Sequence, residues 1–302
     1  TDVPITFDAD TCKRQEPNKE ELTKIYTDLE FRNFIQKLNG EPKKEAAVTT
    51  ASLQFDLFAQ APAEPSAPKS VSDITSVQHT YHLADTTEKQ MVLAELLAKQ
   101  SAFAFDTETE GLEPLTAPLV GMSFAIKEHE AWYVPVPADP QGAAEIVHRF
   151  ASVLSHKDIR KIGQNIKFDI LVLRKYGVKV AGPLFDTMIA HYLLNPELHH
   201  GMDYLAETYL NYKPVPIEQL IGPKGKKQGS MRNVPIEEIK EYAAEDADIT
   251  LQLKSYFEPL MKQEDVESLF YDMEMPLIYV LAEMEATGVK VDTQALKQSS
   301  VT

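Results

Sequence analysis

The chain has 302 residues, 43% hydrophobic and 25% charged, which is enough to bury a sizeable core and to hold two domains. Its 46 Asp and Glu outnumber its 30 Lys and Arg, and the net charge of −16 argues against coating nucleic acid through bulk charge, though not against a local grip aided by metal ions. The single cysteine, Cys12, excludes a disulfide framework and a thiolate metal site. The sequence has neither a ~20-residue apolar run nor a secretory signal, which predicts a cytoplasmic protein with no membrane contact.

The first 38 residues predict one or two short helices, with Asn18 as N-cap and Glu20 and Glu21 in the first turn. This segment is too small to form a core of its own. Residues 39–70 predict a flexible linker, because Ala, Thr, Ser and Pro dominate them. Residues 53–58 are unusually apolar for a linker, so they either dock on the neighbouring domain or act as a linear binding motif.

From residue 71 onward, predicted strands and helices alternate. Strands are predicted at residues 80–83, 101–110, 119–126, 131–136 and 161–163, the third and fourth as a hairpin-like pair. Helices are predicted at residues 86–100, 143–155, 165–176, 185–194, 202–210, 236–262 and 274–286, and a loop at residues 221–232. A short strand at residues 289–292 and the start of a further helix follow. Strands concentrated early and helices later predict an α/β fold, a mixed sheet flanked by helices. In the helix predicted at residues 86–100, the residues expected to face inward are Met91, Leu93, Leu96 and Leu97.

Two acids mark the end of the Phe-rich strand at residues 101–110. Because side chains alternate along a strand, Asp106 and Glu108 point the same way, with Cα atoms roughly 6.5–7 Å apart. Two carboxylates on one face repel each other unless a cation lies between them. Strands also commonly end in solvated acids, so this pair alone does not distinguish a metal site from a solvated strand end.

Two acids in the following helices could join that pair. Asp169 is one turn into a helix, where the helix dipole favours a carboxylate, but it also lies beside a buried stripe formed by Ile166, Ile170 and Leu173. Asp186 stands in the N-cap position of the next helix, and we assign it that structural role.

The helix at residues 236–262 supplies the last acids. Tyr242 and Asp246 lie at i and i+4 on one face, and the alanines between them allow close approach of another element. A phenol beside a carboxylate can orient a water molecule. Glu245 and Asp248 project elsewhere and are predicted to be solvated.

Taken together, Asp106-x-Glu108, Asn165-x-x-x-Asp169 and Tyr242-x-x-x-Asp246 resemble the three motifs of the DEDD exonucleases, in the subgroup that carries a tyrosine. Residues 105–109, 163–165 and 242–248 are similar to the 3′→5′ proofreading exonuclease domain of bacterial family A DNA polymerases, the polymerase I type. The resemblance implies a ribonuclease H-like fold and four segments: the C-terminal tail of a 5′-nuclease domain (1–38), a flexible linker (39–70), the 3′→5′ exonuclease domain (71–263) and the truncated start of a polymerase domain (264–302). Both ends are therefore expected to be cuts through a longer protein, and this piece is not expected to polymerise.

The same resemblance implies a metal-dependent exodeoxyribonuclease that releases nucleoside 5′-monophosphates from single-stranded or frayed 3′ ends. Two Mg²⁺ or Mn²⁺ ions about 3.5–4 Å apart stabilise in-line attack on a phosphodiester, and such hard cations take oxygen ligands. The expected ligands are Asp106, Glu108, Asp169 and Asp246, with Asp106 bridging the ions. Tyr242, aided by Glu108, is expected to position the attacking water.

Contacts to the DNA strand also follow from the resemblance. Leu112 is expected to wedge at the terminal bases, Phe168 and Met188 to line the path of the strand, and Gln164 and Asn165 to contact phosphate or sugar. The loop residues Lys224, Lys226, Lys227 and Arg232 form either a grip on the DNA backbone or a solvated loop.

Partners beyond the DNA strand are suggested by one further likeness. The five residues Gln54, Phe55, Asp56, Leu57 and Phe58 resemble the peptide with which bacterial proteins bind the sliding clamp. We expect a monomer in the bacterial cytoplasm, associated with the nucleoid.

Two alternatives stay open. A ribonuclease D-like exoribonuclease shares the three motifs, but the polymerase-like continuation at residues 275–292 favours DNA. A non-catalytic DNA-binding spacer is the other alternative, and the presence of all four acids argues against it.

Overall fold

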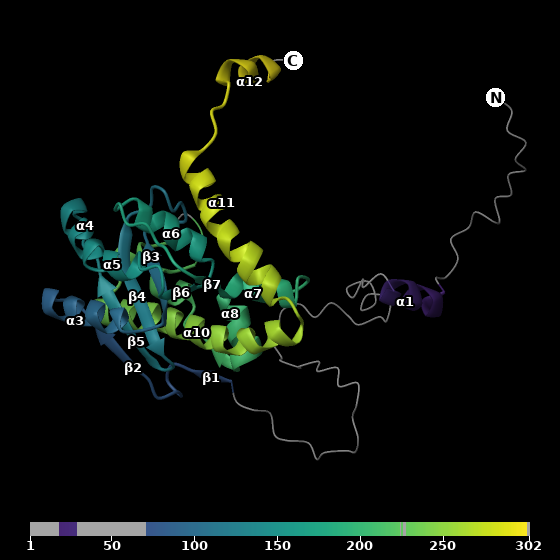
Figure 1. Ribbon diagram of the computed structural model, residues 1–302, viewed down its shortest axis with the longest axis horizontal. Helices are drawn as coiled ribbons and strands as arrows, with labels where there is room; N and C mark the ends of the chain where they lie inside the picture. The colour runs from purple at the N-terminus through teal and green to yellow at the C-terminus, as the bar shows by residue number, and fades with distance from the viewer. Residues whose placement is uncertain (1–17, 29–70, 224, 226–227, 301–302) are drawn as a thin grey trace, which may run out of the picture. The chain divides into compact units, whose positions relative to one another are not determined.

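The computed structural model describes residues 18–28, 71–223, 225 and 228–300 (Figure 1). The chain divides into two units, Thr1–Ala61 and Pro62–Thr302. In the first unit, helix α1 (Lys19–Asp28) follows Asn18, whose Oδ1 accepts a hydrogen bond from the Glu21 N–H at 3.3 Å, so the predicted N-cap is confirmed. The helical pattern beyond residue 28, the linker at 39–70 and the clamp-like segment at 54–58 lie outside the described residues.

The second unit is built on a six-stranded mixed sheet with the order β2–β5–β4–β3–β6–β7. β3 and β4 are antiparallel, as are β4 and β5, whereas the other neighbouring strands are parallel. A two-stranded parallel sheet joins β1 (Ser72–Asp73) to β8 (Tyr212–Lys213). The strands of the main sheet are β2 (Thr80–Leu83), β3 (Ala102–Thr109), β4 (Leu119–Lys127), β5 (Glu130–Pro135), β6 (Arg160–Gly163) and β7 (Leu184–Asp186). The predicted mixed sheet flanked by helices is therefore confirmed.

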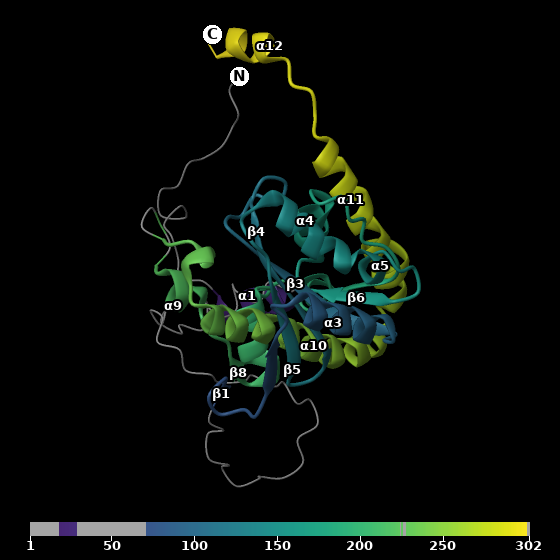
Figure 2. The same cartoon turned by 90° about the vertical axis from the view of Figure 1, so that its left-hand side faces the viewer.

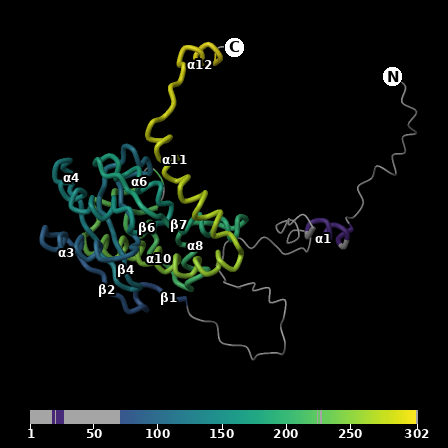
Figure 3. Tube along the Cα trace, in the orientation of Figure 1, coloured from purple at the N-terminus to yellow at the C-terminus, as the bar shows by residue number. Residues whose placement is uncertain are grey.

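The helices of this unit connect the strands and then continue after β8, along the path shown in Figure 3. The α-helices are α3 (Thr87–Ala98), α4 (Pro140–Arg149), α5 (Ala151–Leu154), α6 (Ile166–Arg174), α7 (Thr187–Leu194), α8 (Met202–Leu205), α9 (Ile217–Ile221), α10 (Ile236–Gln263), α11 (Met275–Thr287) and α12 (Thr293–Ser299). Short π-helical segments, η1 (Ala206–Leu210) and η3 (Leu269–Glu274), and a 3₁₀ turn, η2 (Met231–Asn233), complete them. In the described residues, no helix is both long and apolar enough to cross a membrane.

The two faces of the main sheet differ in side-chain size, and this difference positions α10. The helix can be followed along the strands in Figure 2. One face carries large rings: Phe124 of β4 stacks on Phe150, between α4 and α5, with ring centroids 5.0 Å apart. The opposite face carries alanines from three neighbouring strands, Ala104, Ala125 and Ala131, all fully buried. Because these side chains are small, the long helix α10 can lie close against the strands.

Several predicted elements need correction. Met91 is 54% exposed, and Gln90 is buried in its place, because the Gln90 side chain donates to the Ala84 carbonyl and accepts from Arg149. The helix predicted at 143–155 is two helices that begin earlier, since Asp139 caps α4 at Gln141 and Gly142 and the chain breaks at Phe150. The predicted strand at 289–292 is wrong: these residues are exposed and have no strand partner among the described residues.

The segment after α10 packs on the same unit. Phe270 of η3 is fully buried against Phe185, with ring centroids 5.0 Å apart. The Tyr279 hydroxyl of α11 donates to the Gly182 carbonyl at 2.9 Å. Glu283 and Glu285 of α11 form ion pairs with Arg174 and Lys167 of α6. These contacts hold η3 and α11 against β7, α6 and α7.

Candidate metal centre

Three carboxylates from two distant parts of the sequence meet at the end of β3. Asp106 and Glu108 extend from one face of that strand, and Asp246 of α10 faces them. One oxygen atom from each carboxylate lies within 4.8 Å of the others. Glu108 and Asp246 are buried and Asp106 is half-buried. The structure thus brings the first and third predicted motifs together at a spacing that one cation could span.

Asp169 of the second motif lies beside this group. It is buried one turn into α6, and its Oδ1 accepts a hydrogen bond from the Thr107 hydroxyl at 2.5 Å. Burial, followed by the charge of Asp106, raises the pKa of Asp169 well above its usual range. Asp169 is therefore electrostatically part of the cluster, although it does not belong to the tight group of three.

The four acids have no basic partner in the described part of the chain: no Lys, Arg or His forms an ion pair with them there. Burial raises the pKa of Asp106 to about 6. Burial and then the Asp106 charge raise the pKa of Glu108, and burial, Asp106 and Glu108 raise that of Asp246. A divalent cation would relieve this repulsion. An all-carboxylate donor set without nitrogen or sulfur fits Mg²⁺ or Mn²⁺.

Tyr242 points at the same acids from one turn earlier on α10. Burial, followed by the charges of Asp246, Glu108 and Asp106, raises the pKa of its hydroxyl. The phenol consequently stays protonated at neutral pH and can donate a hydrogen bond next to the cluster.

Asp186 has the structural role predicted for it, and a second one. Its carboxylate accepts hydrogen bonds from the Met188 and Ile189 N–H groups at the start of α7, at 2.9 and 3.2 Å. It also accepts from the Asn165 and Ile166 N–H groups, at 3.2 and 2.8 Å. One side chain therefore fastens the start of α6, which carries Asp169, to the start of α7.

Glu245 and Asp248 were predicted to be solvated, and that prediction is wrong. Glu245 is fully buried and accepts from the Tyr212 hydroxyl at 2.5 Å and the Val215 N–H at 2.8 Å. Asp248 is 2% exposed and accepts from the Tyr81 hydroxyl and the His129 N–H, both at 2.8 Å. The two acids anchor α10 on either side of Asp246, because the helix is covered by the sheet and also by the chain around β8 and β2.

The residues expected to contact DNA are arranged around the cluster with different exposures. Leu112 is 94% exposed in the loop between β3 and β4. Asn165 is exposed just before α6, in the left-handed conformation (φ 58°) that asparagine tolerates. Phe168 and Met188 are half-buried. Gln164 is held in place, since its Nε2 donates to the His200 carbonyl at 2.7 Å and its Oε1 accepts from the Thr187 hydroxyl.

The basic loop is described only in part. Lys224, Lys226 and Lys227 lie outside the described residues. Arg232 donates to the Leu119 carbonyl at 2.7 Å and the Val136 carbonyl at 2.9 Å, and it forms an ion pair with Glu110. The guanidinium of Arg232 is thus used to hold the loop against β3, β4 and β5, which argues against the predicted grip on the DNA backbone for this residue.

Thr107 is a site residue that sequence reasoning missed. It lies between the two acids of β3 and so points to the opposite face, where its hydroxyl meets Asp169. The signal was present: a β-branched hydroxyl residue between two carboxylates of a buried strand has its side chain on the side where α6 packs.

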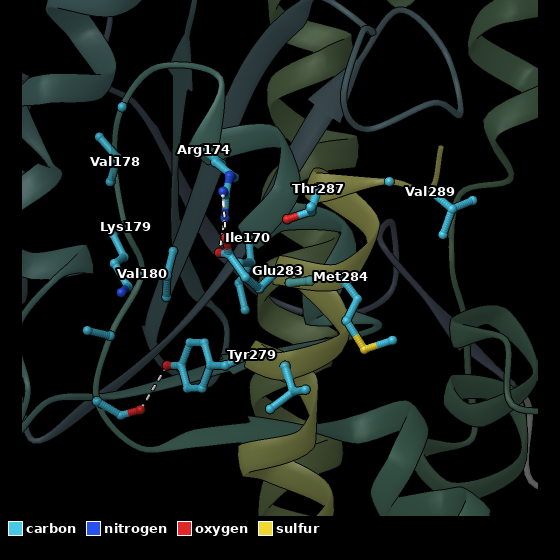
Figure 4. Close-up of a pocket in the computed structure, with 16 residues that line it drawn as sticks. Ile170, Arg174, Val178, Lys179, Val180, Tyr279, Glu283, Met284, Thr287 and Val289 are labelled. Atoms are coloured by element: carbon cyan, nitrogen blue, oxygen red, sulfur yellow. Dashed lines mark hydrogen bonds and ion pairs between the residues drawn. The ribbon is translucent and has the colours of Figure 1, made fainter. Parts of the chain in front are cut away.

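A pocket of about 1110 Å³ lies away from the acids, between α11 and the segment that follows α6 (Figure 4). Its lining is mainly apolar and includes Ile170, Val178, Val180, Tyr279 and Met284, together with the Arg174–Glu283 ion pair. None of the four acids lines it. The pocket is therefore separate from the metal centre, despite its size.

Comparison with known proteins supports the geometry. A family model described as 3′-5′ exonuclease matches residues 81–262. The DNA polymerase I of Chloroflexus aurantiacus is 35% identical over 99% of this chain and 33% of its own length. That of Pseudomonas aeruginosa is 34% identical over 98% of the chain and 31% of its own length. The chain thus spans about a third of the length of the curated relatives it matches.

Solved structures share the fold at low sequence identity. Brucella melitensis NrnC bound to pGG aligns with a TM-score of 0.56 and 21% identity, covering 72% of this chain and 98% of that protein. The POL domain of Pol1 from M. smegmatis, in complex with DNA primer-template and dNTP, aligns with a TM-score of 0.56 and 21% identity, covering 72% and 34%. At this identity the likeness concerns the fold alone.

Proposed function

The chain belongs to the 3′-5′ exonuclease family of family A DNA polymerases, and from that premise we propose that it is the proofreading part of a DNA polymerase I. Its substrate is the single-stranded or frayed 3′ end of DNA, from which it releases nucleoside 5′-monophosphates. The observation that carries this proposal is the convergence of Asp106, Glu108 and Asp246 within 4.8 Å with no basic partner in the described residues.

In the proposed mechanism, the four carboxylates would hold two Mg²⁺ or Mn²⁺ ions, which would supply Lewis-acid stabilisation to the attacking and leaving oxygens. Asp106, Glu108 and Asp246 would supply ligand oxygens from the tight group, Asp106 to both ions. Asp169 supplies a further oxygen from α6, held by the Thr107 hydroxyl. Tyr242, kept protonated by its surroundings, orients the attacking water, and Glu108 assists it.

The strand contacts are proposed from the positions of the remaining residues. Leu112 is exposed enough to separate terminal bases, and Phe168 and Met188 offer half-buried apolar surface for the strand. Gln164 and Asn165 lie just before α6, and their side-chain amides are proposed to contact phosphate or sugar. The three lysines of the basic loop remain candidates for the backbone grip.

The domain division is part of the same proposal. We assign residues 1–38 to the end of a 5′-nuclease domain, 39–70 to a linker, 71–263 to the exonuclease domain and 264–302 to the start of a polymerase domain. Clamp binding through residues 54–58, a monomeric state and a place at the nucleoid in the bacterial cytoplasm belong to the proposal as well. Clamp binding that survives Leu57→Ala with Phe58→Ala would exclude the first of these.

One assay tests the activity: trimming of a 5′-labelled single strand, DNA against RNA, with Mg²⁺ and then with EDTA. We expect DNA shortened from its 3′ end only with Mg²⁺ and, when the labelled strand is annealed to a template, faster at a mismatched than at a paired terminus. Asp106→Asn should abolish trimming, whereas the matched change at an exposed acid, Asp158→Asn, should leave it intact. Preference for RNA would favour the exoribonuclease alternative, and binding without trimming would favour the spacer.

A further inference from the structure

Ser123 of β4 stands out among the buried polar residues. Its side chain is fully buried, and its Oγ is the single buried side-chain nitrogen or oxygen in the described chain without a hydrogen-bond partner. Buried hydroxyls normally find a partner, and a serine without one can be replaced by alanine at no loss of hydrogen bonding. An unpartnered hydroxyl in a protein interior therefore calls for a functional explanation.

The register of the sheet places Ser123 next to the metal centre. Ser123 pairs with Asp106 on β3 and with Tyr133 on β5. Residues directly opposite each other in neighbouring antiparallel strands share a face, with Cβ atoms ~4.5–5.5 Å apart. Ser123 and Asp106 therefore lie side by side on the face that α10 covers, the same face from which Asp106 and Glu108 meet Asp246.

The surroundings of Ser123 on that face offer few other polar groups. Its diagonal neighbours on β3 and β5 include Ala104 and Ala131, and α10 presents Ala243 and Ala247, which are fully buried. The Tyr133 hydroxyl already donates to the Val120 carbonyl at 3.3 Å. In the strand register Asp106 lies directly opposite Ser123 and Glu108 lies diagonally, so on β3 the carboxylate placed next to the serine hydroxyl is that of Asp106.

We propose that Ser123 is a positioning residue of the metal centre, whose hydroxyl donates a hydrogen bond to the Asp106 carboxylate when a divalent ion is bound. This inference rests on the proposed function. A carboxylate has two oxygens, and one that ligates a cation is oriented by a donor on the other. A neutral hydroxyl can provide that donor without adding a positive charge that would compete with the metal. Ser123 thus acts through Asp106 and does not touch the substrate.

The test compares Ser123→Ala with the wild-type chain in two readouts. In EDTA, the midpoint of urea unfolding should stay unchanged or rise, because the lost hydroxyl has no partner in the metal-free protein. Mn²⁺ affinity, measured by calorimetry, should fall by ~10- to 100-fold, the range expected for outer-shell partners of metal ligands. DNA trimming should lose kcat at saturating DNA with little change in KM.

Two further variants keep the experiment decisive. Ser123→Cys preserves the shape of the side chain but donates weakly, so it should also lower Mn²⁺ affinity, and it replaces the alanine variant if that one does not fold. Ser155→Ala makes the same chemical change at an exposed serine and should leave Mn²⁺ affinity intact.

The inference would be overturned if both Ser123 variants bound Mn²⁺ as tightly as the wild type. A lower unfolding midpoint of Ser123→Ala in EDTA would also overturn it, because the hydroxyl would then have a partner in the metal-free protein. These results leave the proposed function standing if the wild-type chain binds Mn²⁺ and trims DNA. Failure of the wild-type chain to do either would overturn both.

Discussion

Neighbouring acids on α10 belong to two different groups of buried carboxylates, which differ in the hydrogen-bond donors that the protein offers them. Glu245 and Asp248 each accept hydrogen bonds from a tyrosine hydroxyl and a backbone N–H, and Asp248 accepts a third from the Gln252 side chain. Asp246, between them, faces Asp106 and Glu108, and burial and these two charges raise its pKa. A carboxylate whose oxygens are satisfied by the protein holds the fold together. A carboxylate buried against other carboxylates destabilises the metal-free protein and is available to a cation.

The largest effect on DNA trimming should come from an isosteric change among Asp106, Glu108 and Asp246, the carboxylates that face one another. Glu108→Gln removes one charge and one ligand, and trimming should fall by about 10³-fold if that ligand contributes several kcal/mol to transition-state stabilisation. In EDTA the same variant should be at least as stable as the wild type, because repulsion with Asp106 is relieved. Single-turnover trimming and urea unfolding measure the two effects. A variant that is both inactive and clearly less stable would contradict the comparison.

The same isosteric change at a hydrogen-bonded acid, Glu245, should lower stability and leave trimming nearly unchanged. In Glu245→Gln one oxygen still accepts from Tyr212, but an amide N–H₂ now faces the Val215 N–H. The loss should be about 2–3 kcal/mol of unfolding free energy, independent of metal, with trimming within a few-fold of wild type well below the melting temperature. Urea unfolding with and without Mg²⁺ checks this. If Glu245→Gln instead lost metal binding at full stability, Glu245 would belong to the metal centre.

Sequence patterns predicted the unsatisfied set better than the satisfied one, for a physical reason. The period of two along β3 placed Asp106 and Glu108 on one face, and the i, i+4 spacing on α10 aligned Tyr242 with Asp246. Both are local rules that depend on one element at a time. The tyrosine and backbone partners of Glu245 and Asp248 are 30 to 167 residues away in the sequence, so the burial of these acids depends on packing that no local pattern contains.

The same limit explains the errors in the fold. Gln90 is buried in place of Met91 because of partners at Ala84 and Arg149, the second 59 residues away. Strand order, the break at Phe150 and the contact of Thr107 with Asp169 also depend on tertiary contacts. The positions of most strands and helices followed from alternation and capping, whereas their mutual contacts did not.

A satisfied neutral cluster extends the comparison to pH. His191 is fully buried between the His200 Nδ1 at 2.6 Å and the Tyr209 hydroxyl at 2.7 Å. Burial and the neighbouring His200 lower the pKa of His191 to about 4. Below pH ~6.5 the unfolded chain binds a proton at this position that the folded chain refuses, so stability present above that pH is lost as the pH falls toward 4.

We expect this residue to contribute a loss on the order of 2 kcal/mol between pH 6.5 and 4.5. His191→Gln cannot be protonated and should show a smaller loss over the same interval, even if it is less stable at pH 7. Urea unfolding at a series of pH values, in EDTA, gives both slopes. Identical slopes would mean that His191 titrates alike in the folded and unfolded chain.

The smallest effect should come from Arg232, a positively charged side chain whose hydrogen bonds are made within the protein. Arg232 uses its donors on Leu119, Val136 and Glu110, so Arg232→Gln should cost about 1 kcal/mol of stability. If Arg232 gripped a phosphate of the DNA strand, the slope of log affinity against log salt would fall by about 0.7. We expect no such change, nor in Arg174→Gln, whose partner is Glu283 on α11. A lower salt slope for Arg232→Gln alone would show that a charged group can be structural and still serve the substrate, and the rule drawn from the carboxylates of α10 would not extend to cations.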